Sequence, residues 1–344
     1  MPLRYSPYLA AIVVATSLIS TGQAQVAPRS EAPSTSIADR AGSDDGFGLI
    51  VTASADGKGS LEMCGCGRQP LGGLARRVGY ENAVLELTKG QAGLLRLDAG
   101  GAFDDSVDTG KNEVIPHIRN EWVLRGYLAR DVTAINAAVS DLRYLSQMNA
   151  IEDRQARLDR FPMLGRVVSA NLVPAGPGVV PFLPFIVRDV PAPRIGSKPV
   201  RVAVVGICAA GAESDAESFG YRINDPVAAL SALMPEVRKQ ADVVVLLAYS
   251  PVERARSIAL AVPGVDLVFV ANNFFPDHEV ASKSGNVTVA PVVLQSRTLT
   301  EVRGWRATTG AWRFEPRSVL LDGAIPSDGP TLELVYRARA DIIR

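Results

Sequence analysis

The sequence predicts a layered α/β fold, and two observations predict it. From about residue 47 to residue 270, short apolar runs rich in β-branched residues alternate with segments whose apolar residues recur at helical spacing. That alternation is typical of sheets covered by helices rather than of a helical bundle. Residues 287–321 instead have the pattern of antiparallel hairpins, with turn residues at Gly304 and Gly310, which argues against a plain doubly wound sheet.

The first half of the pattern opens with an apolar strand at residues 47–52. A loop rich in Gly and Cys follows, and then a helix at 71–87, where Leu74, Val78 and Val84 recur at helical spacing. The next predicted elements are a strand at 94–97, a helix at 112–129, a strand at 132–135, a helix at 137–148 and a strand at 166–172.

The second half begins after Pro174 with a passage rich in Pro and Gly that contains one strand, residues 182–187. A β-branched run predicts a strand at 200–207, and Pro226 opens the first turn of a helix at 226–240. The remaining predicted elements are a strand at 242–249, a helix at 251–261, a strand at 265–270 and a closing helix at 331–343.

Composition is that of a globular protein, and the N-terminus is that of an exported one. The hydrophobic share is 47%, and 36 Lys and Arg balance 36 Asp and Glu, so no global charge attracts nucleic acid. Residues 1–24 have the layout of a secretory signal peptide, with an uncleaved anchor as the alternative. Residues 25–45 predict a disordered linker. We expect one domain at 46–344, periplasmic or secreted, with no membrane span after signal cleavage.

The loop at residues 55–77 contains two of the three cysteines, Cys64 and Cys66, between a strand and a helix. Domains of the α/β class present their chemistry at such strand ends. The third cysteine, Cys208, ends another predicted strand. Three cysteines do not make a disulfide scaffold. One pair with a remaining thiol, or three thiols at a single site, both stay open.

The order of elements and several local phrases resemble the catalytic domain of the periplasmic 5'-nucleotidase and UDP-sugar hydrolase family of calcineurin-like metallophosphoesterases. The resemblance runs from about Phe47 to the C-terminus and includes Gly-Ala-Trp-Arg-Phe-Glu-Pro at 310–316 and Ala-Ile-Pro at 324–326. It implies a four-layer αββα sandwich with mixed sheets, and a two-metal site at the C-terminal edges of the strands.

Most metal motifs of that family are altered at the matching positions. Its Asp-x-His becomes Asp56-Gly57-Lys58, and its bridging carboxylate falls at Gly101. Its Gly-Asn-His-Glu motif falls near Ala138-Val139-Ser140-Asp141, and its later strand-ending His is Tyr249. Its Gly-His-x-His motif becomes Ala271-Asn272-Asn273-Phe274. The family's imidazole ligands and its bridging carboxylate are therefore missing.

A dinuclear site needs two cations held by carboxylates and imidazoles, with one carboxylate shared between them. The chain has only His117, expected to be a surface or packed residue, and His278, the better ligand candidate. The ammonium group of Lys58 would repel a cation. We therefore expect no dinuclear site. An internal ion-pair network should remain in the vacated pocket, formed by Asp56, Lys58, Asp98 and Asp141, with Tyr249, Asn272 and Gln295 along its wall.

The Cys64-Gly65-Cys66 loop resembles an exported subgroup of the family that bears this CGC signature. Two thiols at this spacing would close a small, strained and easily reduced disulfide, or would bind a soft metal such as Cu(I) or Zn with further ligands. The strand-end position of Cys208 allows a three-thiol cluster. The structural alternatives are a loop staple for Cys64 and Cys66 and a buried small hydrophobic residue for Cys208.

Three functions are compatible with these residues. The first is an exported pseudo-metallophosphoesterase whose CGC loop performs thiol redox or soft-metal chemistry, with an exported redox protein as its partner. The second is a non-catalytic binding module whose cysteines only brace a loop. The third is a residual 5'-nucleotidase-like hydrolase of phosphate or sulfur esters. Arg68, Arg76 and Arg77 would lower the pKa of a nearby thiol, or would form a solvated helix face.

Overall fold

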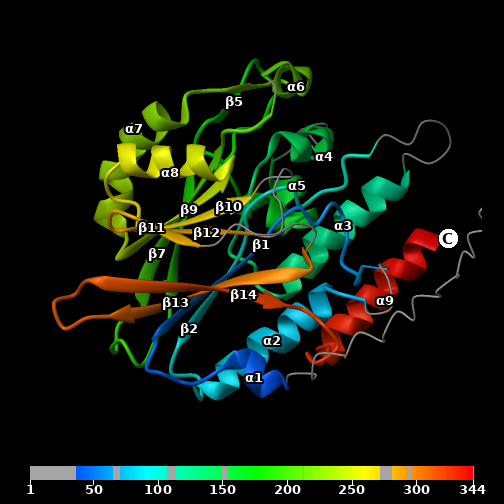
Figure 1. Ribbon diagram of the computed structural model, residues 1–344. Helices are drawn as coiled ribbons and strands as arrows, with labels where there is room; N and C mark the ends of the chain where they lie inside the picture. Colours follow the sequence, from blue (N-terminus) through cyan, green and yellow to red (C-terminus); the bar gives the residue numbers. More distant parts are fainter. Residues whose placement is uncertain are drawn as a thin grey trace, which may run out of the picture. The chain divides into compact units, whose positions relative to one another are not determined.

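The computed structural model describes residues 36–64, 70–106, 114–148, 154–211, 213–271, 281–292 and 296–343 (Figure 1). These residues belong to one compact unit built around two six-stranded sheets. The predicted signal peptide at 1–24 lies outside the described residues. The predicted α/β class with mixed sheets is confirmed, because both sheets combine parallel and antiparallel pairs.

The first sheet has the strand order β14-β13-β1-β2-β3-β4. Its centre is β1, which runs parallel to β2 and antiparallel to β13, so that Val51 lies opposite both Leu95 and Val302. The strands are β1 (Leu49–Ser54), β2 (Gly93–Asp98), β3 (Ala134–Asn136), β4 (Val167–Val168), β13 (Thr298–Arg306) and β14 (Trp312–Leu320).

The second sheet has the order β11-β12-β10-β9-β7-β6. Its core is the parallel set β12, β10, β9 and β7, in which Cys208 at the end of β7 lies opposite Tyr249 at the end of β9. The strands are β6 (Phe185–Val190), β7 (Val200–Cys208), β9 (Val243–Tyr249), β10 (Leu267–Ala271), β11 (Ser282–Ser284) and β12 (Val287–Pro291).

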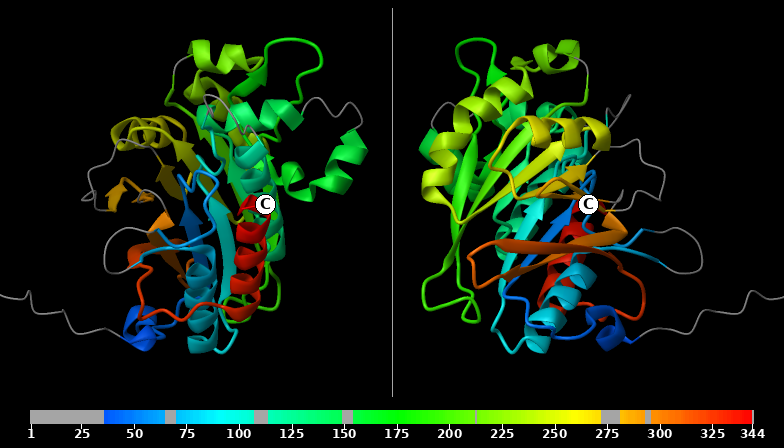
Figure 2. Two further views of the ribbon diagram at one scale, coloured as in Figure 1. Left: turned by 90° about the vertical axis from the view of Figure 1, so that its right-hand side faces the viewer. Right: turned by 60° about the vertical axis from the view of Figure 1, so that its left-hand side comes forward.

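The two sheets pack face to face, and helices cover their outer faces (Figure 2). Alternate residues of β1, such as Leu49 and Val51, enter the core shared with β7 and β9, whereas Ile50 packs beneath α2. On the first sheet lie α2 (Leu74–Leu87) and α3 (Val114–Ala129), with α9 (Gly329–Ile343) packed against both; on the second lie α7 (Pro226–Gln240) and α8 (Val252–Ala261). The predicted four-layer order of helix, sheet, sheet and helix is therefore observed.

Short elements differ most from the sequence-based expectation. The predicted helix at 137–148 is a 3₁₀ turn, η1 (Val139–Asp141), followed by α4 (Leu142–Gln147). The predicted strand at 166–172 is divided between β4 and β5 (Leu172–Pro174), and β5 pairs with β8 (Tyr221–Ile223) in a separate two-stranded sheet. The sequence pattern did not predict α5 (Arg154–Arg160), η3 (Pro162–Arg166) or α6 (Glu213–Ser218). Such one- and two-turn elements carry too little periodicity to be recognised.

Residues 36–45, the last part of the predicted linker, are described in the structure and contain a short helix. Helix α1 (Ile37–Ala41) begins with a capping box between Ser36 and Asp39. The guanidinium groups of Arg303 and Arg317 both donate to the carbonyl oxygen of Ala41. These partners lie more than 250 residues away in the sequence, so local composition could not indicate them.

One helix position yields a stability prediction. Gly79 lies inside α2. Replacing Gly with Ala inside a helix normally stabilises the helix by about 1 kcal/mol. A Cβ at Gly79 would overlap the carbonyl oxygen of Pro326. We therefore expect Gly79→Ala to lower the free energy of unfolding by about 1–3 kcal/mol in a urea titration. Gly126→Ala in α3 is the control, since its Cβ would meet only side-chain methyl groups. A stabilised Gly79→Ala variant would contradict the close approach.

Of the helices in the described ranges, none is long and apolar enough to cross a membrane.

Candidate functional site

The candidate site lies where β1 and β2 end, and backbone hydrogen bonds join the loops that follow them. The amide of Asp56 donates to the carbonyl oxygen of Gly100 at 2.8 Å, and that of Lys58 to Gly101 at 3.0 Å. Both residues have left-handed backbone conformations, with φ of 52° for Asp56 and 47° for Lys58. Such conformations are uncommon outside glycine and persist where surrounding contacts enforce them, often at functional sites.

Of the three aspartates predicted for the pocket, two have both carboxylate oxygens engaged in hydrogen bonds. Asp141 accepts the backbone amides of Gly101 and Ala138 at Oδ2 and that of Phe103 at Oδ1, at 2.9–3.0 Å. Burial raises the pKa of Asp141 to about 6, although the three amides oppose the shift. These bonds tie the loop after β2 to η1, which gives Asp141 a structural role.

Asp98 is held in the same way at the end of β2. Its Oδ2 accepts the hydroxyl groups of Tyr127, at 2.7 Å, and Ser54, at 2.9 Å, while Oδ1 accepts the amide of Gly100. Burial raises the pKa of Asp98, and these hydrogen bonds oppose the shift. Tyr127 comes from α3, so Asp98 faces the helical layer.

Asp56 differs from the other two, because one of its oxygens has no partner. The phenol of Tyr249 donates to Oδ1 at 3.2 Å, and Oδ2 is buried without a hydrogen bond. The residue is only 1% exposed. Burial raises the pKa of Asp56 to about 7, with contributions from Asp98 and Asp141, and Lys58 partly offsets the shift. The structure thus brings four of the predicted pocket residues together: Asp56, Asp98, Asp141 and Tyr249.

Lys58 does not complete the predicted internal ion-pair network. Its Nζ pairs with Oδ2 of Asp105 at 3.1 Å, and both side chains are partly exposed. The side chain of Lys58 reaches the loop after β2, where its Nζ donates to Asp105. Hydroxyl and amide donors therefore hold Asp98 and Asp141, whereas the charge of Lys58 acts on Asp56 while Lys58 itself pairs with Asp105.

The described residues do not fit the pair of cations that the resemblance implies. The position of the bridging carboxylate is Gly101, where a Cβ would overlap Oδ1 of Asp56. The position of a strand-end imidazole is Tyr249, whose phenol occupies that same oxygen. In the described ranges, no three His, Cys, Asp or Glu side chains are grouped so as to hold a metal ion. A hard cation would find one open carboxylate oxygen at Asp56 and no shared ligand.

The two described cysteines lie in different surroundings. Cys64 is half-buried, its amide donates to the carbonyl oxygen of Leu71 at 2.8 Å, and it lines a cavity of about 170 Å³ against α9. Cys208 is a free thiol, fully buried between the sheets, and burial raises its pKa to about 11. The buried hydrophobic alternative therefore describes the packing of Cys208. Cys66 lies outside the described residues.

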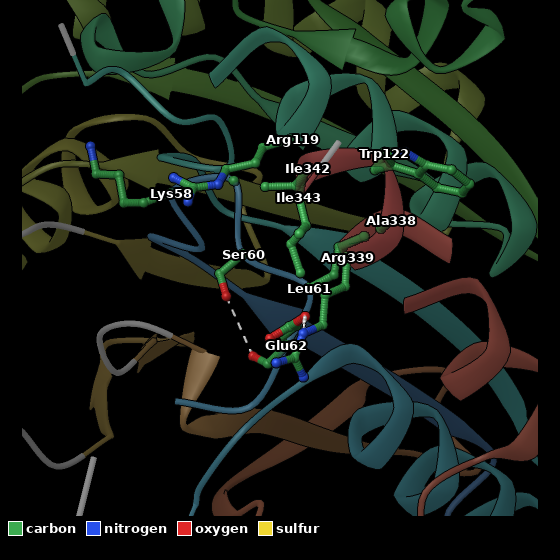
Figure 3. A pocket seen from close by; sticks show the side chains of 11 residues that line it. Lys58, Ser60, Leu61, Glu62, Arg119, Trp122, Ala338, Arg339, Ile342 and Ile343 are labelled. Carbon is green, nitrogen blue, oxygen red and sulfur yellow. Dashed lines mark hydrogen bonds and ion pairs between the residues drawn. The ribbon is translucent and has the colours of Figure 1, made fainter. Parts of the chain in front are cut away.

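A larger cavity of about 400 Å³ opens beside Lys58 (Figure 3). Its apolar walls include Leu61 and Trp122, and residues 338, 339, 342 and 343 of α9 also line it. Figure 3 shows Arg339 beside Glu62, 4.0 Å apart between Nε and Oε1, with the side chain of Lys58 extending away from them. The cavity and the Cys64 cavity share residues 61, 62 and 339, so they adjoin each other along the segment that leads to Cys64.

Arg77 does not belong to a solvated helix face. It is 4% exposed and donates to Oε1 of Glu81 at 3.2 Å, to the Ser54 hydroxyl and to the Leu97 carbonyl oxygen. Glu81 is buried as well. Burial raises the pKa of Glu81, but the charges of Arg77 and Arg96 outweigh that effect and hold this pKa below its ordinary value. Sequence reasoning missed this network; the i, i+4 spacing of Arg77 and Glu81 was the available signal.

The other predicted residues divide into two groups. Arg76 donates to the carbonyl oxygen of Leu321 at 3.3 Å. His117 is partly exposed on α3, where it contacts Glu121 at 3.2 Å and the ring of Tyr144. Asn272, His278, Gln295 and Arg68 lie outside the described residues.

Neither a protein-family model nor a curated protein matches the sequence. Solved structures do match the fold. A calcineurin-like phosphoesterase, YfkN of Bacillus subtilis, is 15% identical with a TM-score of 0.63, over 86% of this chain and 97% of that one. At this identity the likeness shows the fold alone: the chain has the fold of calcineurin-like phosphoesterases.

Two further solved structures that match the fold both come from Thermus thermophilus. One is a 5'-nucleotidase precursor, 17% identical with a TM-score of 0.61, and 86% of this chain covers 59% of it. The other is the sulfate thiohydrolase SoxB, 16% identical with a TM-score of 0.63, and 86% of this chain covers 61% of it. The chain thus spans about three fifths of the length of these two proteins.

Proposed function

We propose that the protein is an exported pseudo-metallophosphoesterase that has kept the fold and lost the dinuclear site. The observation that carries the proposal is the Asp56–Tyr249 contact. A phenol donates to the one carboxylate oxygen that faces Gly101, where the family's bridging ligand would stand. The other two aspartates are saturated by donors of the chain itself. Two divalent cations held about 3.5–4 Å apart need several open carboxylates and imidazoles.

We further propose that the CGC loop performs the chemistry of this protein, as a thiol redox pair or a soft-metal site for Cu or Zn. Cys64 is half-buried beside an apolar cavity, whereas burial and a raised pKa make Cys208 an inert thiol. Thiolates prefer soft metals, and the CGC spacing favours a reducible disulfide over a structural one. Export, an exported redox partner and a periplasmic or secreted location belong to the same proposal.

A thiol titration of the reduced native protein, combined with metal analysis, tests this function. We expect two thiols to react rapidly and the third only after unfolding, with at most one soft metal ion per chain. The double variant Cys64→Ser/Cys66→Ser should lose the rapid reaction and any bound metal. Cys208→Ser is the matched control and should keep both. Two divalent cations per chain in the purified protein, or one unreactive disulfide, would contradict the proposal.

A binding module is the second candidate, and the cavity beside Lys58 favours it. That cavity has about 400 Å³ of space and combines Trp122 and Leu61 with the cations Arg119 and Arg339, a lining suited to an amphipathic ligand. Ligand or partner binding that survives the double cysteine substitution would support the module over the thiol function. Mn-dependent turnover of a generic phosphoester or thiosulfate ester, abolished by Asp56→Asn, would instead establish a residual hydrolase.

A further inference from the structure

The cavity of about 400 Å³ beside Lys58 has a lining of two kinds. Three of its charged side chains are cations, Lys58, Arg119 and Arg339, and one is a carboxylate, Glu62. The apolar part of the lining consists of Leu61, Trp122, Ala338, Ile342 and Ile343. A ligand that matches this lining therefore needs both a charged group and an apolar body.

Two of the cations lie next to each other. Nζ of Lys58 pairs with Oδ2 of Asp105 at 3.1 Å, and Nη1 of Arg119 pairs with Oδ2 of Asp104 at 2.9 Å. Because these carboxylates belong to consecutive residues, the two cations are neighbours, and Figure 3 shows Arg119 directed toward Lys58. Neither aspartate lines the cavity. An ammonium and a guanidinium each have several N–H donors, so both can bind a further acceptor from the cavity side.

The apolar wall is held in place by contacts within the chain. Nε1 of Trp122 donates to Oδ2 of Asp341 in α9 at 3.1 Å, and the guanidinium of Arg125 lies 4.9 Å from the centre of the Trp122 ring. Ile343, at the end of α9, is 72% exposed. An alkyl chain that covered Ile343 and Trp122 would remove apolar surface from water, which favours binding.

We propose that this cavity binds a single-chain carboxylate amphiphile, such as a medium-chain fatty acid anion. The inference rests on the binding module proposed above and names the class of its ligand. The carboxylate accepts hydrogen bonds from Lys58 and Arg119, and the alkyl chain contacts Trp122 and Ile343. A singly charged head group fits better than a phosphate dianion, because nearby carboxylates already offset the three cations: Asp104, Asp105 and Glu62.

The volume of the cavity sets an upper limit on the size of the amphiphile. A dry apolar cavity of about 150 Å³ holds benzene. By that measure, about 400 Å³ has room for roughly sixteen non-hydrogen atoms. Decanoate is smaller than this limit and has one charge and one unbranched chain, so decanoate is the probe.

Calorimetric titration of the full chain with decanoate tests the charged contact. We expect one decanoate to bind per chain with a dissociation constant below about 1 mM, and hexanoate to bind at least tenfold more weakly. Lys58→Met should weaken decanoate binding at least fivefold. Lys89→Met is the matched control, because Lys89 is an exposed lysine with a similar φ, 51° against 47°. Equal affinity in Lys58→Met, or no saturable binding of decanoate up to about 5 mM, would overturn the proposal.

Tryptophan fluorescence locates the ligand and separates the two proposals. Decanoate should change the fluorescence of the native protein and of Trp312→Phe, since Trp312 lies on β14, but not that of Trp122→Phe. A change that persists in Trp122→Phe would place decanoate elsewhere and overturn the assignment. Decanol and decyltrimethylammonium should bind at least fivefold more weakly than decanoate. If either binds as tightly with the same Trp122 signal, the binding module stands and the carboxylate class is wrong. If none of the three amphiphiles gives that signal, both proposals fail at this cavity.

Discussion

Replacing Arg77 with Met is expected to lower the free energy of unfolding by about 3–5 kcal/mol, the cost of breaking a buried ion pair on one side. Glu81 is fully buried and would keep Arg96 and the hydroxyl of Thr52 as partners. Ser54 and the Leu97 carbonyl oxygen would each lose a donor at the end of β1 and β2. A urea titration followed by circular dichroism measures the change.

The control for this substitution is Arg125→Met. Arg125 also pairs with a glutamate four residues away, Glu121 at 3.3 Å, but its side chain is 53% exposed. Exposed pairs contribute about 0–1 kcal/mol, so the control should change stability little. Equal effects of the two substitutions would show that the Arg77 network does not support the sheet edge.

Replacing Asp56 with Asn is expected to remove a pH dependence of stability. The pKa of Asp56 is raised by burial to about 7 in the folded protein, against about 3.9 when unfolded. Between these values the folded state holds a proton that the unfolded state has lost, so stability falls as the pH rises. The loss is complete above pH ~7 and reaches about 2–4 kcal/mol. Asp56→Asn keeps an acceptor for the Tyr249 hydroxyl without the charge.

The measurement is the free energy of unfolding at several pH values between about 4 and 9. We expect the free energy of unfolding of Asp56→Asn to increase, relative to that of the native protein, by about 2–4 kcal/mol as the pH rises through this range. Asp44→Asn is the control: the pKa of Asp44 is lowered by its hydrogen bond with Arg194, so its contribution disappears only as the pH falls. An unchanged difference between native protein and Asp56→Asn across the range would refute the assignment of a neutral Asp56.

The long elements could be predicted because each one buries a large apolar face. The runs that form β7 and β9 are apolar over seven residues or more, and such runs enter a core wherever the chain folds. Short elements depended on distant partners. Arg303 and Arg317 donate hydrogen bonds to the last residue of helix α1. Strand β5 forms by pairing with β8. No local window of sequence contains either partner.

The chemical identity of the site residues is a property of the chain before it folds. The glycine at 101, the tyrosine at 249 and the scarcity of histidine limit which metals can bind, whatever the geometry. Folding settled which donors meet which acceptors. It turned Lys58 toward Asp105, buried Arg77 against Glu81 and left one oxygen of Asp56 without a partner. Hydrogen bonds and ion pairs act over a few ångströms between residues far apart in sequence, so they become defined only in the packed structure.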